Sequence, residues 1–175
     1  HERDPPDAGR PRDDGGDGMK TALVLTMLAA GATGATAQEL SVDRDIVEAC
    51  FQSVREDALA LPGCVGEAAA QCQTRPGGAT TLGIGECLAA ETAVWSGLMA
   101  QAYDDAITRL GPSDARLISA LEESQAAWVA YRAADCGLQY VVWIEGSIRT
   151  VVAGTCHLKK TAARAFDLSN LGDMK

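Results

Sequence analysis

Histidine is scarce in this 175-residue chain, which argues against most catalytic sites. The two histidines are His1 and His157. A Ser-His-Asp or Cys-His arrangement in the main part of the chain would have to use His157, and no nucleophile motif surrounds it. The cysteines form no C-x-x-C pair, and no His, Cys and Asp cluster has zinc-ligand spacing. We therefore expect a protein that is not an enzyme and that uses no metal or cofactor.

The sequence also has no apolar run of the roughly 20 residues that a bilayer crossing needs. The shorter run Thr21–Ala30 follows Met19-Lys20 and precedes Ala35-Thr36-Ala37, the small-x-small pattern of a signal-peptidase site. We expect residues 19–37 to be a signal peptide that is cleaved before Gln38. No cysteine follows at that point to carry a lipid, so the mature chain would have no membrane anchor.

Residues 1–18 contain one alanine and are otherwise mostly Pro, Gly, Asp and Arg, a composition that cannot form a core. We expect this segment to be non-structural and to lie upstream of the true start at Met19. Residues 38–175 then form a single domain that is long enough for a hydrophobic core. Its expected location is the periplasm or the extracellular medium.

Basic residues are outnumbered, with 15 Lys and Arg against 24 Asp and Glu and a net charge of −9. Residues 38–175 hold 11 and 18 of these, a net charge of −7. An acidic domain argues against nucleic acid and anionic membranes as partners. It is compatible with a basic protein partner.

Six cysteines are present, and all of them follow the predicted signal peptide. An even number of cysteines in an exported chain is typical of a domain held together by disulfides. They are Cys50, Cys64, Cys72, Cys87, Cys136 and Cys156.

Strand signals are weak, and apolar residues recur at helical intervals between Gly and Pro breaks. We expect an all-α bundle of four or five helices, with Ser113 as the N-cap of the fourth. The predicted helices span residues 42–61, 64–73, 81–110, 114–143 and 148–168.

The third and fourth predicted helices each carry an apolar stripe with one tryptophan, Trp95 and Trp128. A short Gly-Pro-Ser turn joins them, so we expect them to pack antiparallel with both tryptophans in the core. Glu91 lies one turn before Trp95, and a buried carboxylate needs a partner. Either Arg132 pairs with Glu91 inside the bundle, or Arg132 pairs with Asp135 on the surface.

These two helices carry a recognisable set of residues. It comprises Cys87, Leu88, Glu91, Trp95, Leu98 and Tyr103, then Gln125, Trp128, Tyr131, Arg132, Asp135 and Cys136, and finally Gly146-Ser147 and Cys156-His157-Leu158. The set resembles the LprI-like lysozyme-inhibitor N-terminal domain family over about residues 72–166. The resemblance implies a small, helical, secreted or periplasmic domain, some of whose relatives inhibit lysozyme. It supplies no catalytic residues.

Six cysteines can pair in many ways, so their number does not fix the connectivity. We expect sequential pairs, Cys50–Cys64, Cys72–Cys87 and Cys136–Cys156. The first two span short segments broken by Pro-Gly, which lets neighbouring helices meet. The third would join the last two helices across Gly146, and the resemblance supports it.

The leading interpretation is a non-catalytic binding module, with lysozyme as the candidate partner. The alternative is a structural or stress-related envelope protein with another partner. Blocking a lysozyme cleft would need a protruding segment, and two turns between paired cysteines qualify, Thr74–Gly85 and Trp143–Arg149. Arg75 or Arg149 could pair with a carboxylate of the enzyme. The plain alternative is that both turns are ordinary loops with solvated arginines.

Overall fold

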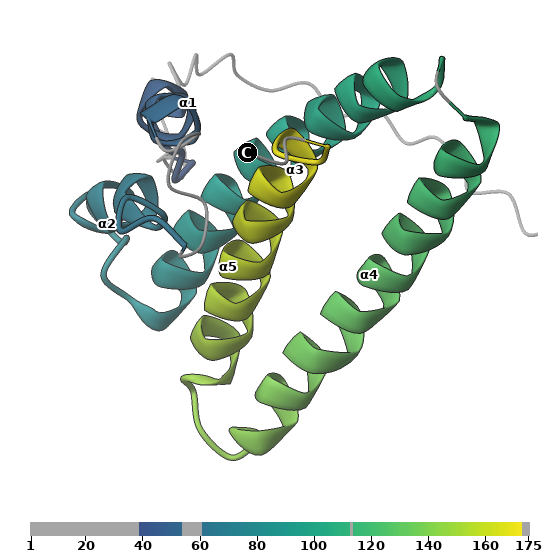
Figure 1. Ribbon diagram of the computed structural model, residues 1–175. Coiled ribbons are helices and arrows are strands. Elements are labelled where there is room, and N and C mark those ends of the chain that lie inside the picture. The colour runs from purple at the N-terminus through teal and green to yellow at the C-terminus, as the bar shows by residue number, and fades with distance from the viewer. Residues whose placement is uncertain (1–38, 54–60, 113, 173–175) are drawn as a thin grey trace, which may run out of the picture. The chain divides into compact units, whose positions relative to one another are not determined.

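The computed structural model describes residues 39–53, 61–112 and 114–172, which are helical with no strand among them. They all lie in one compact unit that spans residues 37–175. The helices, shown in Figure 1, are α1 (Arg44–Ser53), α2 (Glu67–Gln73), α3 (Thr81–Leu110), α4 (Ala115–Val142) and α5 (Arg149–Ser169). This arrangement confirms the predicted all-α fold. The predicted signal peptide and the segment before it lie outside the described residues, as does residue 38 at the expected cleavage point. None of the described helices combines the length and apolarity of a membrane span.

The helix ends follow the expected signals closely, with three differences. The first predicted helix begins at Arg44 and is described only to Ser53, because residues 54–60 lie outside the described part. Helix α2 begins at Glu67, since Gly66 before it has a left-handed backbone with φ of 103°. The predicted N-cap Ser113 lies outside the described residues. The structure places Asp114 at that cap, where its carboxylate accepts from the Arg116 N–H at 2.9 Å.

The core forms between α3 and α5, which lie side by side and make the most extensive helix pair (Figure 1). The aromatic rings of Phe51 in α1, Trp95 in α3 and Phe166 in α5 meet there, with centroids 5.4–6.1 Å apart. Ala162 and Ala165 of α5 are fully buried. Their small side chains allow the two helices to approach closely.

The expected α3–α4 pair is wrong. Helix α4 packs mainly on α5 and touches α3 only slightly. As a result Trp128 is half-buried, whereas Trp95 is completely buried. Helix α5 packs on α3 where α4 was expected. The reason is that α5 gathers its apolar residues on one face, whereas the apolar residues of α4 are spread around its circumference.

Three disulfides tie the helices together, and they confirm the sequential pairing. Cys50–Cys64 links the end of α1 to the segment before α2, Cys72–Cys87 links α2 to α3, and Cys136–Cys156 links α4 to α5.

Candidate functional site

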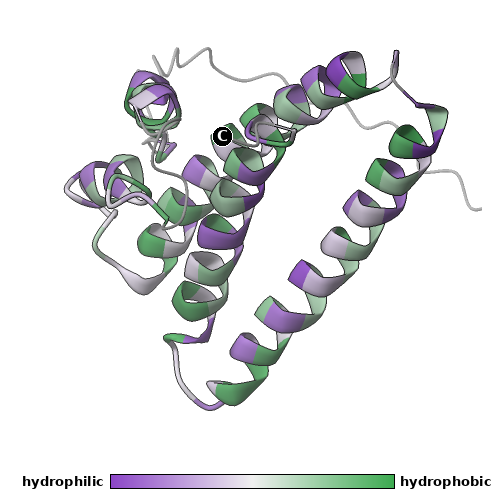
Figure 2. Cartoon of the chain, viewed as in Figure 1, coloured by the Kyte–Doolittle hydropathy of each residue, from purple (hydrophilic) through white to green (hydrophobic). Residues whose placement is uncertain are grey.

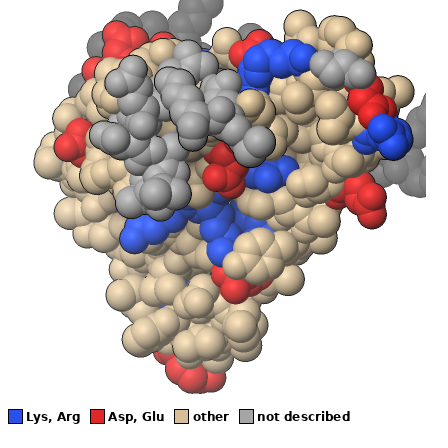
Figure 3. Space-filling view, viewed as in Figure 1, with Lys and Arg blue, Asp and Glu red and all other residues tan. Residues whose placement is uncertain are grey.

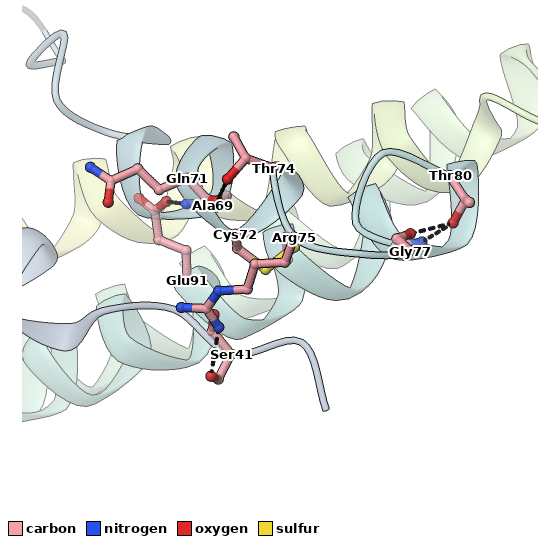
Figure 4. The surroundings of a disulfide bond; sticks show 11 residues. Ser41, Ala69, Gln71, Cys72, Thr74, Arg75, Gly77, Thr80 and Glu91 are labelled. Carbon is pink, nitrogen blue, oxygen red and sulfur yellow. Dashed lines mark hydrogen bonds between the residues drawn. A yellow bond between two sulfur atoms is a disulfide. The ribbon is translucent and has the colours of Figure 1, made fainter. Parts of the chain in front are cut away.

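Glu91 is the most deeply buried charged residue in the described part of the chain, with 1 % of its surface exposed. Its carboxylate accepts hydrogen bonds from the Gly66 N–H at 2.8 Å, the Ala69 N–H at 2.7 Å and the Trp95 indole N–H at 3.0 Å. Figure 4 shows Glu91 pointing from α3 to Ala69 at the start of α2. The side chain therefore supplies the N-terminal cap of α2, which lacks a side-chain cap of its own.

This arrangement explains how a buried carboxylate persists without an arginine. The first turn of a helix presents unpaired N–H groups and a partial positive charge, and both stabilise a negative charge. Glu91 is therefore a structural residue that holds α2 on α3. Tyr103, also in the predicted motif, lies further along α3 and packs partly buried against the core.

Arg132 forms neither of the two expected ion pairs. Its Nη1 donates to the Thr161 hydroxyl of α5 at 2.9 Å, and its guanidinium lies 4.8 Å from the centre of the Trp128 ring. Asp135 instead pairs with Lys160 of α5 at 3.1 Å. Arg132 and Asp135 therefore both find their partners in α5, which follows from the packing of α4 on α5.

The remaining motif residues of α4 also face α5. The Lys160 ammonium donates to the Tyr131 hydroxyl at 2.8 Å and lies 4.3 Å from its ring centre. The hydrogen bond to Tyr131 and the interaction with Asp135 raise the pKa of Lys160. Arg164 donates to the Gln125 side-chain oxygen at 2.9 Å. Figure 3 shows Lys and Arg side chains gathered in the middle of this face.

His157 lies on the same side of α5, and it is part-buried. Burial lowers its pKa, and the nearby positive charge of Arg132 lowers that pKa further. Among the residues that the structure describes, no group of three or more His, Cys, Asp or Glu side chains could hold a metal ion.

The turn between α4 and α5 exposes a cluster of large apolar side chains, which we call the apolar tip. Each is between 47 % and 65 % exposed, and Figure 2 shows hydrophobic colour at this end of α4. The members of the tip are Leu138, Val141, Val142, Trp143, Ile144 and Ile148. In the sequence, the run from Val141 to Ile144 could have indicated this surface. Its residue types are those typical of a buried strand, so the sequence does not show that these side chains are exposed.

Hydrogen bonds from Arg149 and a disulfide fix the conformation of the turn that carries the apolar tip. The Arg149 Nε donates to the Tyr140 hydroxyl at 2.9 Å, and its Nη1 donates to the Gly146 carbonyl at 3.0 Å. The Cys136–Cys156 disulfide joins the two helices nearby. Arg149 therefore holds the turn in shape instead of projecting from it.

The other candidate turn, between Cys72 and Cys87, offers less apolar surface. Arg75 donates through Nη1 to the Ser41 carbonyl at 2.8 Å and to its hydroxyl at 3.1 Å (Figure 4). Leu82 is 73 % exposed and is the large apolar side chain presented there. The turn is tight, because a Cβ on Gly83 would clash with the Gly77 carbonyl oxygen.

Comparison with known proteins adds one match. A model of the family described as lysozyme inhibitor LprI matches residues 72–168, more than half of the chain. No curated protein and no solved structure matches the chain. The matched segment contains Glu91, the aromatic and basic residues between α4 and α5, and the apolar tip, whereas α1 lies outside it.

Proposed function

The chain belongs to the family of the lysozyme inhibitor LprI, and from this premise we propose that it is a secreted, non-catalytic module that binds and inhibits a lysozyme. The proposed contact surface is the apolar tip. The exposure of the six apolar side chains of the tip at one turn is the observation that carries this proposal.

A contiguous exposed apolar cluster marks an interaction surface more often than a merely solvated one. Trp143 is the natural anchor, since tryptophan dominates the binding energy of many protein interfaces. The brace formed by Arg149 and the Cys136–Cys156 disulfide adds to this, because a turn ordered before binding loses little entropy on binding. A turn that joins two long helices also has the convex form that can enter a cleft.

Charge supports the same partner. Lysozymes are usually basic proteins, so a secreted module of net charge −7 over residues 38–175 would be attracted to them. Arg75 and Arg149 make hydrogen bonds within the chain. We therefore no longer propose that one of these arginines pairs with a carboxylate of the enzyme. The preferred binding mode is apolar contact through Trp143 and Ile144.

The test is lysozyme turnover in the presence of the purified oxidised protein, with chicken-type and goose-type enzymes. We expect inhibition that Trp143→Ala weakens about tenfold or more. Leu82→Ala is the matched control, because it removes an exposed apolar side chain from the other disulfide-bounded turn. No inhibition of either enzyme at roughly tens of micromolar protein would discard the proposal. Weak inhibition that disappears at a few hundred millimolar salt would show charge attraction without specific binding.

A further inference from the structure

A cavity of about 380 Å³, open to solvent on one side, lies where the ends of α3, α4 and α5 meet. Leucines from all three segments line it, namely Leu110, Leu117, Leu121, Leu168 and Leu171. Its volume lies within the range of about 300–1,000 Å³ that is typical of small-molecule sites, and such sites are mostly apolar with a few polar groups. The apolar tip adjoins the first residue of α5, so the two features are roughly 20 Å apart along that helix.

The guanidinium of Arg164 lines the cavity. Its Nε donates to the Gln125 side-chain oxygen at 2.9 Å and its Nη2 to the Ser124 hydroxyl at 3.0 Å. These neutral partners orient the guanidinium but leave its charge in place. Burial lowers the pKa of Arg164, and the nearby charge of Asp167 offsets this only in part.

A second guanidinium, that of Arg132, lies against the same tryptophan ring as Arg164. Arg164 lies 6.0 Å from the centre of the Trp128 ring, and Arg132 lies 4.8 Å from it. Within the described ranges, no carboxylate lies at ion-pair distance from either arginine. A partly desolvated arginine without a counter-ion favours an anion beside it.

We propose that this cavity binds a single-chain fatty acid. The hydrocarbon chain would lie among the leucines, and its carboxylate would accept hydrogen bonds from Arg164. Asp167 also lines the cavity, so a ligand with one negative charge fits better than one with several. The site is independent of the proposed lysozyme contact.

Isothermal titration of the purified full chain with decanoate, below the concentration at which decanoate forms micelles, tests this proposal. We expect one saturable site, with decanol and decylamine binding at least about tenfold more weakly. Arg164→Gln should weaken decanoate about tenfold and leave decanol unchanged, because it removes a charge-assisted hydrogen bond. Lys159→Gln removes the same charge from an exposed position of α5 and should leave decanoate binding unchanged.

A second variant tests the location. Ala120 lines the cavity from an exposed position on α4, so Ala120→Phe should fill the cavity without disturbing the fold. We expect this variant to lose decanoate binding while its circular dichroism and urea midpoint stay unchanged. The proposal is overturned if decanoate shows no saturable binding, or if Ala120→Phe binds it normally. Equal binding of decanol and decanoate, unaffected by Arg164→Gln, would overturn it as well.

Discussion

Helices α3 and α4 are almost equal in length, at 30 and 28 residues, but they contribute very differently to the protein. Helix α3 buries eight residues, including Glu91 and Trp95, whereas α4 buries Leu121 and Cys136. Apolar content alone therefore does not make a core helix. The apolar side chains of α4 are distributed around its axis, and several of them stay exposed.

The two helices are also held in different ways. Helix α3 is fixed by aromatic packing and by the hydrogen bonds of Glu91. Helix α4 is fixed to α5 by one disulfide and by polar contacts such as the one from Arg132 to Thr161. The stability of the fold should therefore reside mainly on the α3 side, and the binding surfaces on the α4 side.

Replacing each tryptophan by alanine gives the largest contrast. Trp95→Ala should lower the free energy of unfolding by about 3–5 kcal/mol, since it empties the centre of the core. Trp128→Ala should cost less, about 1–2 kcal/mol, because its ring lies outside the aromatic core, is partly exposed and lies against two guanidinium groups. Urea denaturation of both variants measures the difference. Equal losses would refute the contrast between the helices.

Removing the disulfide between α4 and α5 gives the second contrast. The double variant Cys136→Ser/Cys156→Ser should lose about 3 kcal/mol in the chain-entropy model. Because α4 buries few side chains and is otherwise held to α5 by part-exposed polar contacts, its amides should exchange hydrogen faster than those of α3. The double variant Cys72→Ser/Cys87→Ser is the control, and it should leave the exchange in α4 unchanged. Uniform acceleration over both helices in the first variant would argue against a loosely held α4.

The smallest contrast compares two glutamates within α3. Glu91→Gln should cost about 2 kcal/mol, because one side-chain oxygen that accepts from a backbone N–H becomes a donor. Glu86 lies exposed on the same helix, so Glu86→Gln should change the unfolding free energy by less than about 0.5 kcal/mol. A urea midpoint for Glu91→Gln that matches the control would show that the cap of α2 contributes little.

The sequence was sufficient for the helical fold and for most of the helix ends, such as the end of α3 at Gly111-Pro112. It left the disulfide connectivity open: the sequential pairs were an expectation, the third of them supported by the family resemblance, and the structure confirms all three. The helix pairing failed because a periodic stripe shows that a face is apolar without showing which face it meets.

Two features of the candidate site were missed for similar reasons. The partners of Glu91 are mainly backbone N–H groups, and no pattern of side chains reveals them. The apolar tip was hidden because the run from Val141 to Ile144 has the composition of a buried strand. The apolar tip is exposed because the α4–α5 turn lies at the far end of these two helices.

The cap of α2 has a consequence for the order of folding. Helix α2 has seven residues, too few to persist in isolation, and its cap comes from Glu91, which lies 25 residues after Gly66 in the chain. Helix α2 can therefore become stable only after α3 has formed and docked. The same docking brings Cys72 to Cys87, so we expect the oxidation of this pair and the formation of α2 to occur together, after α3 has formed.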